Sequence, residues 1–306
     1  MNIYLDSPLE CLPPPPPMLA PVPTIPTAVR PMTELFERYA VECLPLLSPR
    51  TQRWYRHHIR DLIRDFGNFE QGAIRPKDIG RWMQAPGVAR QHRNKTRSVL
   101  SAVLNLAAGV WFVEGIDSNP CSLVKKHPSK PRDRYIGDDE FKAVRAMATF
   151  PFQLAMDLAL ITGQRRGDIL DLTWMNVRHD FLDVTQGKSG KRLGIKITPK
   201  LAEVLLRARQ YKPFVGPRLY VVRTRTGEPF SHEGFSSAWQ RLMNDALRTG
   251  AIRKRFTFHD LRAKCASDKK NLQSASALLG HSDQGLTRRI YVRNLQMVDP
   301  GEGLPT

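Results

Sequence analysis

A polar, basic and proline-bearing stretch, NPCSLVKKHPSKPRDR at residues 119–134, interrupts a chain whose apolar residues otherwise recur mostly at helical spacing. Such a stretch can continue neither a helix nor a buried strand, and its composition is typical of a linker. A chain of 306 residues is long enough to build two separate hydrophobic cores. We therefore predict two domains joined by a basic linker at residues 119–135.

The chain begins with a proline-rich segment. Residues 12–31 contain PPPPPMLAPVPTIPTAVRP, a composition that favours extended, polyproline-like backbone. We predict a disordered leader at residues 1–31, with the docking of a partner as the alternative. The opening residues carry no basic flank and no apolar run of signal-peptide length, so we expect no secretory signal.

The region before the linker, residues 32–118, is predicted to form a helical domain. Its apolar residues follow the spacing of about four helices. Ser48 and Pro49 have the residue types of an N-cap and a first helical position. The last helix begins with the basic stretch ARQHRNKT and becomes apolar later. Its basic face is either a DNA-binding surface or an ordinary solvated helix face.

The region after the linker, residues 136–306, is predicted to be mostly helical with one short sheet. The stretch FLDVTQGKSGKRLGIKIT alternates apolar and polar residues around a Gly-Lys-Ser-Gly turn, which indicates a β-hairpin. Helical spacing resumes after it. The expected fold class is mainly α with a small antiparallel β-sheet.

The charge of the chain points to a polyanionic partner. The formal net charge is +18 and the isoelectric point is about 10.1. The basic excess falls in the helical region, the linker and the second region alike, as expected if nucleic acid is bound by more than one domain. An anionic membrane surface is a weaker candidate, because no basic amphipathic helix with bulky apolar anchors is evident.

The four cysteines are scattered, with no CxxC pair: Cys11, Cys43, Cys121 and Cys265. This spacing predicts isolated reduced thiols and argues against a zinc site.

Four short patterns in the second region carry candidate chemistry, although each is weak alone. They are TGQRRGDILDL with Arg165, TQGKSGK with Lys188, FHDLRAK with His259 and Arg262, and LLGHSDQGLTRRIYVR with His281 and Tyr291. His259 and Arg262 lie three residues apart and so share one helix face. Taken singly, each pattern could equally be a surface arginine beside a helix cap, a solvated turn lysine or a half-buried aromatic.

In this order and spacing the four patterns resemble those of the tyrosine recombinases, the phage-integrase family. The resemblance covers residues 137–293, and residues 32–118 are similar, less specifically, to the core DNA-binding domain of that family. It implies a site-specific DNA recombinase that cleaves through a 3′-phosphotyrosine on Tyr291, most simply for integration or excision of a prophage or mobile element. It implies no metal and no cofactor.

The residue types suit that chemistry. A phosphodiester under attack spreads negative charge over its non-bridging oxygens, and the planar guanidinium groups of Arg165 and Arg262 could clamp them. The resemblance assigns Lys188 as general acid toward the leaving 5′-oxygen, His259 as proton acceptor near the nucleophile, and His281 as a hydrogen-bond donor to the phosphate. Asp168 is expected to support Arg165 without reacting.

The resemblance also implies partners. They are double-stranded DNA attachment sites, three further copies in a homotetramer on DNA, a host DNA-bending factor and an excisionase; we expect no membrane partner and a bacterial cytoplasmic location. Residues 90–97 are candidates for major-groove contacts. Backbone phosphates are expected to be contacted by Lys191, Arg192, Lys254, Arg255, Arg288 and Arg289.

Two departures from the family pattern leave alternatives open. His281 and Tyr291 are ten residues apart, whereas nine is the commoner spacing, so the loop could be out of register and the enzyme inactive. Cys265 stands where a small residue is expected, and a packing role is favoured over catalysis. A non-catalytic DNA-binding protein on this fold and a type IB topoisomerase are the rival functions.

Overall fold

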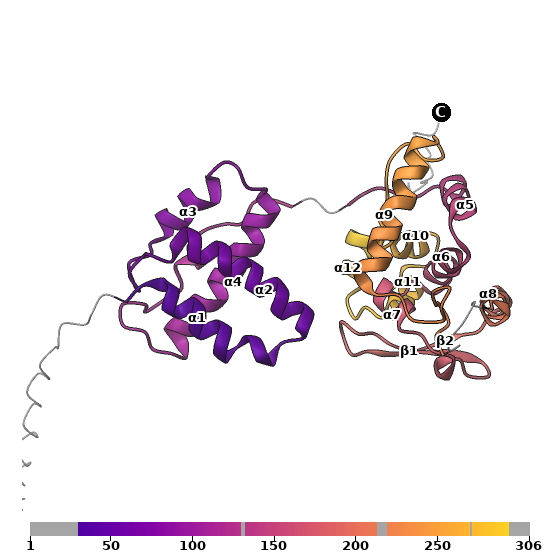
Figure 1. Cartoon of the computed structure of the whole chain (residues 1–306), viewed down its shortest axis with the longest axis horizontal. Helices are drawn as coiled ribbons and strands as arrows, with labels where there is room; N and C mark the ends of the chain where they lie inside the picture. Colours follow the sequence, from indigo (N-terminus) through magenta and orange to yellow (C-terminus); the bar gives the residue numbers. More distant parts are fainter. Residues whose placement is uncertain (1–29, 130–131, 213–218, 270, 294–306) are drawn as a thin grey trace, which may run out of the picture. The chain divides into compact units, whose positions relative to one another are not determined.

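The computed structural model describes residues 30–129, 132–212, 219–269 and 271–293. The chain forms two compact units, Met1–Ser129 and Lys130–Thr306 (Figure 1). Most of the predicted leader, residues 1–29, lies outside the described residues. Within the part of the chain that is described, no helix is both long and apolar enough to cross a membrane.

The first unit is a helical bundle. Helix α2 presents buried residues at helical spacing, and it packs against both α1 and α4. Its start follows the predicted signals, because the Ser48 side chain accepts from the Thr51 amide and Pro49 is the first helical residue. The helices of this unit are α1 (Met32–Glu42), α2 (Pro49–Phe66), α3 (Pro76–Gln84) and α4 (Arg90–Gly109), with two 3₁₀ turns, η1 (Leu44–Leu46) and η2 (Pro120–Leu123).

Several described residues of the predicted linker, 119–129 and 132–135, contact the unit to which they belong, while its assignment as the linker between two domains stays a prediction. Cys121 on η2 is fully buried in the core of the first unit. The backbone amide of His127 donates to Asn94 on α4 at 2.8 Å. At the other end, Arg134 donates to Glu140 of the second unit at 2.6 Å. A polar and basic composition concealed these contacts, because they are made by single side chains and backbone groups rather than by a periodic apolar face.

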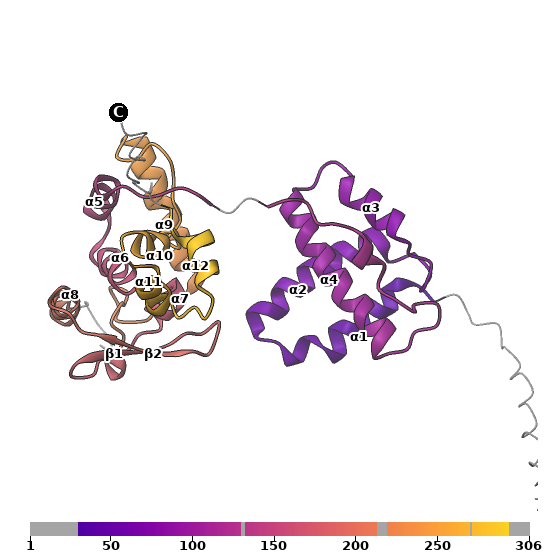
Figure 2. The ribbon, with the colours of Figure 1, turned by 180° about the vertical axis from the view of Figure 1, so that it is seen from behind.

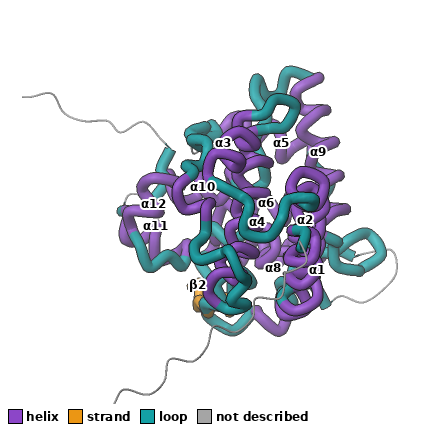
Figure 3. Tube along the Cα trace, turned by 90° about the vertical axis from the view of Figure 1, so that its left-hand side faces the viewer, coloured by secondary structure: helices purple, strands orange, loops and turns teal. Residues whose placement is uncertain are grey.

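The second unit is mostly helical with a two-stranded antiparallel sheet, as predicted (Figures 2 and 3). In the hairpin, Asp183 pairs with Gly194 and Thr185 with Arg192. The elements are α5 (Asp138–Met147), α6 (Phe150–Thr162), α7 (Arg166–Leu170), η3 (Trp174–Asn176), β1 (Phe181–Thr185), β2 (Arg192–Lys196), α8 (Pro199–Gln210), α9 (His232–Arg248), α10 (Asp260–Ser267), α11 (Leu272–Leu279) and α12 (Gln284–Tyr291).

Helix α10 lies at the centre of this unit, where it packs against α6, α11 and α12. All of its residues are buried, including charged ones, so it has no solvent face. Cys265 is one of the small residues that allow this close packing, and its sulfur lies near the backbone of Gly163. Burial raises the pKa of the Cys265 thiol to about 11, which keeps it protonated and favours the packing role.

Candidate active site

Arg262 on α10 connects three of the four sequence patterns. Its Nη1 donates to the carbonyl of Gly163 at 2.6 Å, and its Nη2 donates to the carbonyl of Leu279 at 2.7 Å. Nη2 also lies 3.1 Å from Nε2 of His281. Gly163 ends α6 in the left-handed conformation, just before Arg165, and Leu279 ends α11, just before Gly280 and His281. The buried Arg262 guanidinium therefore bonds the backbone just before Arg165 and just before His281.

Tyr291, the last residue of α12, lies beside this arginine. Its hydroxyl is 3.3 Å from Nε2 of His259, and its ring centroid is 5.4 Å from the Arg262 guanidinium carbon. Ser267 on α10 donates from its hydroxyl to the Tyr291 carbonyl at 2.9 Å and accepts from the Arg293 amide at 2.8 Å. Although Tyr291 follows His281 by ten positions, α12 places the tyrosine inside the cluster.

The hydrogen bonds of His281 define its tautomer. Arginine can only donate, so Nε2 of a neutral His281 accepts from Arg262, and Nδ1 then carries the proton and donates to the Thr287 hydroxyl at 2.8 Å. Thr287 is itself within 2.9 Å of the Ser276 hydroxyl. Donation from Nε2 to a phosphate, the role expected for His281, therefore requires a second proton or a turn of the ring away from Arg262.

Both histidines are held in the neutral form. Desolvation, and then repulsion from Arg262, lowers the pKa of His259 and that of His281 to about 4. His259 is exposed when taken as a whole residue, while crowding by the surrounding protein removes much of the hydration of its imidazole. A neutral His259 can accept a proton through Nε2, the atom that faces the Tyr291 hydroxyl.

Arg165 and Asp168 lie at the start of α7. The Asp168 carboxylate accepts from the Arg165 amide at 3.3 Å and lies 3.9 Å from its Nη1. The other Asp168 oxygen accepts from the amide of Gly187 at 2.9 Å. Asp168 therefore supports Arg165 and also holds the hairpin turn that carries Lys188.

A buried pair of glutamines, which the sequence analysis did not single out, completes the site. Oε1 of Gln186 accepts from Nη1 of Arg165 at 2.9 Å and from the Ser189 hydroxyl at 3.0 Å. Its Nε2 donates to Oε1 of Gln164 at 2.8 Å and to the Leu279 carbonyl at 3.0 Å. Both glutamines are essentially unexposed. Their position two residues before Lys188 and one before Arg165 was the only signal available from the sequence.

Lys188 lies on the exposed turn between β1 and β2. It takes no part in the hydrogen bonds that join the other candidates within the described part of the chain. Its two neighbours are anchored, because Gly187 bonds to Asp168 and Ser189 bonds to Gln186. The turn is thus fixed at its base while the lysine side chain stays free to swing.

The site carries an excess of positive charge. Burial, and then repulsion from Arg165, lowers the pKa of Arg262. The Nε atom of Arg262 is buried and has no hydrogen-bond partner among the described residues. Two mutually repelling guanidinium groups make this part of the second unit favourable for an anion.

The six predicted phosphate contacts differ in availability. Arg192 is already paired through two nitrogens with Asp183, and Arg255 donates to the side chain of Gln240. All six side chains are exposed, and the other four are Lys191, Lys254, Arg288 and Arg289.

The candidate groove-reading stretch, residues 90–97, is partly unavailable, which corrects the expectation for it. Arg93 is buried over the Trp82 ring and pairs with Asp65. Arg97 donates to the Cys121 carbonyl. Exposed side chains remain at Arg90, Gln91 and Lys95.

Known proteins with similar sequences are recombinases. The chain is 24% identical over 256 residues to the integrase of Escherichia phage HK022, an alignment that covers 79% of this chain and 70% of the relative. It is 26% identical over 219 residues to the shufflon-specific DNA recombinase of Escherichia coli, covering 66% of this chain and 51% of the relative.

Similar solved structures have the same fold. A lambda integrase dimer bound to a COC′ core site matches with a TM-score of 0.71 and 21% identity, covering 89% of this chain and 81% of that one. The Tn1549 transposon integrase (residues 82–397, R225K) in complex with a circular intermediate DNA matches with a TM-score of 0.66 and 14% identity, covering 85% and 95%. The profile of the phage integrase family matches residues 140–297, more than half of the chain. The chain therefore belongs to the phage integrase family of tyrosine recombinases and is an enzyme of site-specific DNA recombination.

Proposed function

We propose that Tyr291 is the nucleophile of this recombinase and that strands are cut and rejoined through a 3′-phosphotyrosine intermediate. The observation that carries the proposal is the position of the Tyr291 hydroxyl, 3.3 Å from a neutral His259 and beside the Arg262 guanidinium. A hydroxyl in this place has a proton acceptor on one side and an anion-binding pair of arginines on the other.

In the proposed step, the Tyr291 oxygen attacks phosphorus and its proton passes to Nε2 of His259. The new bond joins that oxygen to phosphorus while the bond from phosphorus to the 5′-oxygen breaks, and Lys188 delivers a proton to the departing oxygen. The phosphotyrosine keeps the bond energy, so a 5′-hydroxyl can reverse the step and reseal the strand.

Arg165 and Arg262 would stabilise the pentavalent transition state through the positive charge and the planar N–H donors of their guanidinium groups. Removal of one donor of this kind typically costs about 3–4 kcal/mol of transition-state stabilisation. Because two guanidinium groups supply the positive charge, we propose that the step needs no metal ion. Asp168 acts only by holding Arg165 and the hairpin turn.

The unit at residues 136–306 is proposed to be the catalytic domain, and residues 32–118 the core DNA-binding domain. One similar structure is a lambda integrase tetramer bound to a Holliday junction, and it supports a homotetramer of this chain on two attachment sites. The exposed cations near the site would supply salt-dependent contacts to backbone phosphates. Integration or excision of a mobile element in the bacterial cytoplasm, aided by a DNA-bending factor and an excisionase, completes the proposal.

The test uses DNA from the locus that flanks the gene. Nicked suicide duplexes tiled across it are incubated with the protein and resolved under denaturing conditions. We expect a covalent protein–DNA band that Tyr291→Phe abolishes, with DNA binding by gel shift retained. Binding to a duplex that carries the site without any covalent band, in the unmodified protein, would refute the proposal and favour a non-catalytic DNA-binding protein.

The topoisomerase alternative is tested on a supercoiled plasmid that lacks the site. Relaxation of that plasmid at a rate similar to cleavage of the site-bearing duplex would favour a type IB topoisomerase. Cleavage confined to the site-bearing duplex is the result expected for a recombinase.

A further inference from the structure

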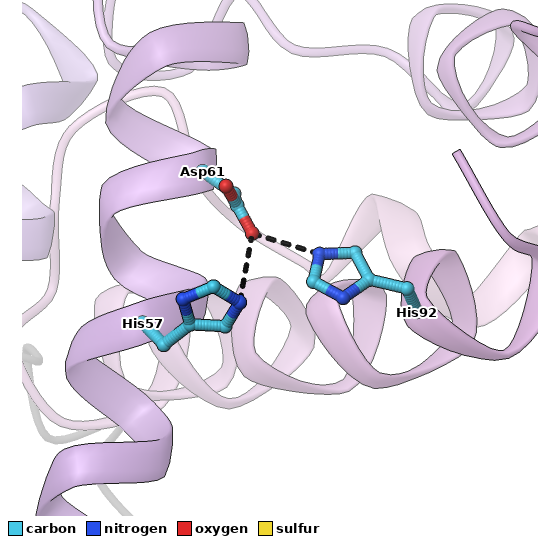
Figure 4. A group of neighbouring side chains, drawn as sticks. All are labelled: His57, Asp61 and His92. Carbon is cyan, nitrogen blue, oxygen red and sulfur yellow. Dashed lines mark hydrogen bonds and ion pairs between the residues drawn. The ribbon is translucent and has the colours of Figure 1, made fainter. Parts of the chain in front are cut away.

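A cluster of two imidazoles and one carboxylate lies in the first unit, which carries none of the candidate active-site residues (Figure 4). His57 and Asp61 are four residues apart on α2 and so share one face, and His92 is on α4. One Asp61 oxygen lies 2.8 Å from Nε2 of His92 and 4.0 Å from Nε2 of His57. In Figure 4 both rings turn a nitrogen toward that oxygen. We propose that His57, Asp61 and His92 bind one divalent transition-metal ion such as Zn²⁺.

The donor set fits this class of metal. Imidazole nitrogen and carboxylate oxygen are ligands for zinc and its neighbours, whereas calcium and magnesium require mostly oxygen. Three protein ligands leave a coordination position for water, as in other three-ligand zinc sites. Our expectation of no zinc site rested on cysteine spacing, and that of no metal in catalysis rested on the family resemblance. Neither carries information about a site made of histidine and aspartate.

The geometry needs only a small adjustment. The three candidate ligand atoms lie within 4.8 Å of one another, whereas tetrahedral zinc with bonds of about 2.0–2.1 Å needs them about 3.3 Å apart. The side chain of His57 is 55% exposed, so it can rotate toward the other two without disturbing packed neighbours. The pair of Asp61 and His92 is already in contact.

The Asp61 carboxylate is oriented by a contact that a bound metal ion would leave intact. Its other oxygen accepts from Nη1 of Arg64 at 3.3 Å, so the carboxylate can keep that bond while its first oxygen turns to a metal. The ion would replace the hydrogen bond between Asp61 and His92. Its effect would be to join α2 to α4 by direct bonds, and so to stiffen the unit proposed to bind core DNA.

The first test measures binding to the whole chain, purified without a histidine tag and freed of metal with a chelator. Zn²⁺ is titrated by calorimetry, and Co²⁺ is titrated while its visible absorption is recorded. We expect one equivalent to bind, and a Co²⁺ band of the intensity typical of a tetrahedral site. Metal that binds the folded chain alone also raises the unfolding temperature, since a metal concentration 100 times the dissociation constant shifts the folding equilibrium about 100-fold.

Two variants and a matched control assign the site. His57→Ala and His92→Ala each remove one ligand and should weaken binding by about 100-fold, more than the loss of an outer partner typically does. His179→Ala removes an exposed histidine of the other unit and should leave binding unchanged. His57 is exposed, so its replacement should leave the unfolding temperature of the metal-free chain unaltered, which separates loss of a ligand from loss of the fold.

Either of two results would overturn the proposal. One is the lack of saturable one-to-one binding of Zn²⁺ or Co²⁺. The other is binding that survives in both ligand variants, which would place the ion elsewhere. Both outcomes are independent of DNA cleavage, so they do not bear on the proposed role of Tyr291.

Discussion

Arg165 and Gln186 are joined by a hydrogen bond of 2.9 Å between Nη1 and Oε1, and the same Gln186 oxygen accepts from Ser189 in the turn that carries Lys188. A buried amide thus orients the Arg165 side chain directly and holds the turn from which the Lys188 side chain extends. The amide follows the end of β1, and its hydrogen bonds within the described part of the chain do not reach Tyr291. We infer that it acts as a positioning residue.

Replacement of Gln186 should therefore affect both the unfolding free energy and the rate of cleavage, and a matched variant separates the two effects. Gln186→Met keeps the volume but removes the hydrogen bond from Arg165 and one of the two hydrogen bonds to the Leu279 carbonyl, which keeps its bond from Arg262. The loss should cost about 1–3 kcal/mol of unfolding free energy. Cleavage of the suicide duplex should fall at least about tenfold because Arg165 is no longer oriented. The measurements are urea unfolding and single-turnover cleavage.

Gln164→Met is the matched control for that variant. It breaks the same amide–amide hydrogen bond and frees the Leu278 carbonyl, but it leaves the bond from Gln186 to Arg165 intact. We expect a similar loss of stability with a much smaller loss of cleavage. Equal losses of cleavage in the two variants would contradict a positioning role for Gln186.

Gly280 is expected to resist replacement for two separate reasons. Its φ of +71° lies in the left-handed region, and a Cβ there would meet the Gln186 amide at 3.0 Å. Gly250 has a φ of +73°, but a Cβ added there would meet no atom within 4 Å, so Gly250→Ala carries only the backbone strain, about 1–2 kcal/mol. Gly280→Ala should be more destabilising in urea unfolding and should also slow cleavage. Equal unfolding free energies for the Gly280→Ala and Gly250→Ala variants would show that the Gln186 side chain moves aside without cost, and would contradict this prediction.

Arg262→Lys should be a severe change although the positive charge is kept. A single ammonium cannot bond the Gly163 and Leu279 carbonyls together in the geometry of a guanidinium, so at least one of these two buried hydrogen bonds is lost. We expect a loss of about 1–3 kcal/mol in unfolding free energy. Cleavage should fall about 100- to 1,000-fold. Arg248→Lys, on an exposed turn of α9, is the control and should change neither measurement.

The second unit should lose stability as the medium is acidified. His259 and His281 have a pKa of about 4 in the folded protein and an ordinary value near 6.5 when unfolded. The unfolded chain therefore binds more protons below pH 6.5, so the stabilising difference is complete above that pH and is lost as the pH falls toward 4. The urea midpoint should drop between pH 7 and pH 5, and the drop should be smaller in a His259→Gln, His281→Gln double variant.

The ordered patterns of the sequence predicted most of the cluster. Arg165, His259, Arg262, His281 and Tyr291 lie in four separate segments, and hydrogen bonds and ring contacts bring them together. The hairpin was predicted because apolar and polar residues alternate along a strand with a period of two, which differs from the period of a helix. Assignment of a catalytic role to each residue stays a prediction until the cleavage assays are done.

The supporting contacts could not be predicted because they follow no period and need no special residue type. Gln164, Gln186, Ser267 and Thr287 are common polar residues whose roles arise only when distant segments meet. The same reason explains the stretch 90–97, where a basic composition indicated a free surface but Arg93 is buried against the Trp82 ring and pairs with Asp65. A charged side chain is buried where a partner offsets its charge, and the partner of Arg93 is Asp65, 28 residues away in the sequence.

The hydrogen bond from the Ser267 hydroxyl to the Tyr291 carbonyl has a consequence for complementation between mutant alleles. Because Ser267 and Arg262 belong to one helix, each chain presents its tyrosine to its own arginine. Two alleles, one encoding Tyr291→Phe and one encoding Arg262→Ala, should therefore fail to complement each other when both are expressed in one cell. In any mixed assembly every subunit would carry one of the two defects, and none could repair its neighbour.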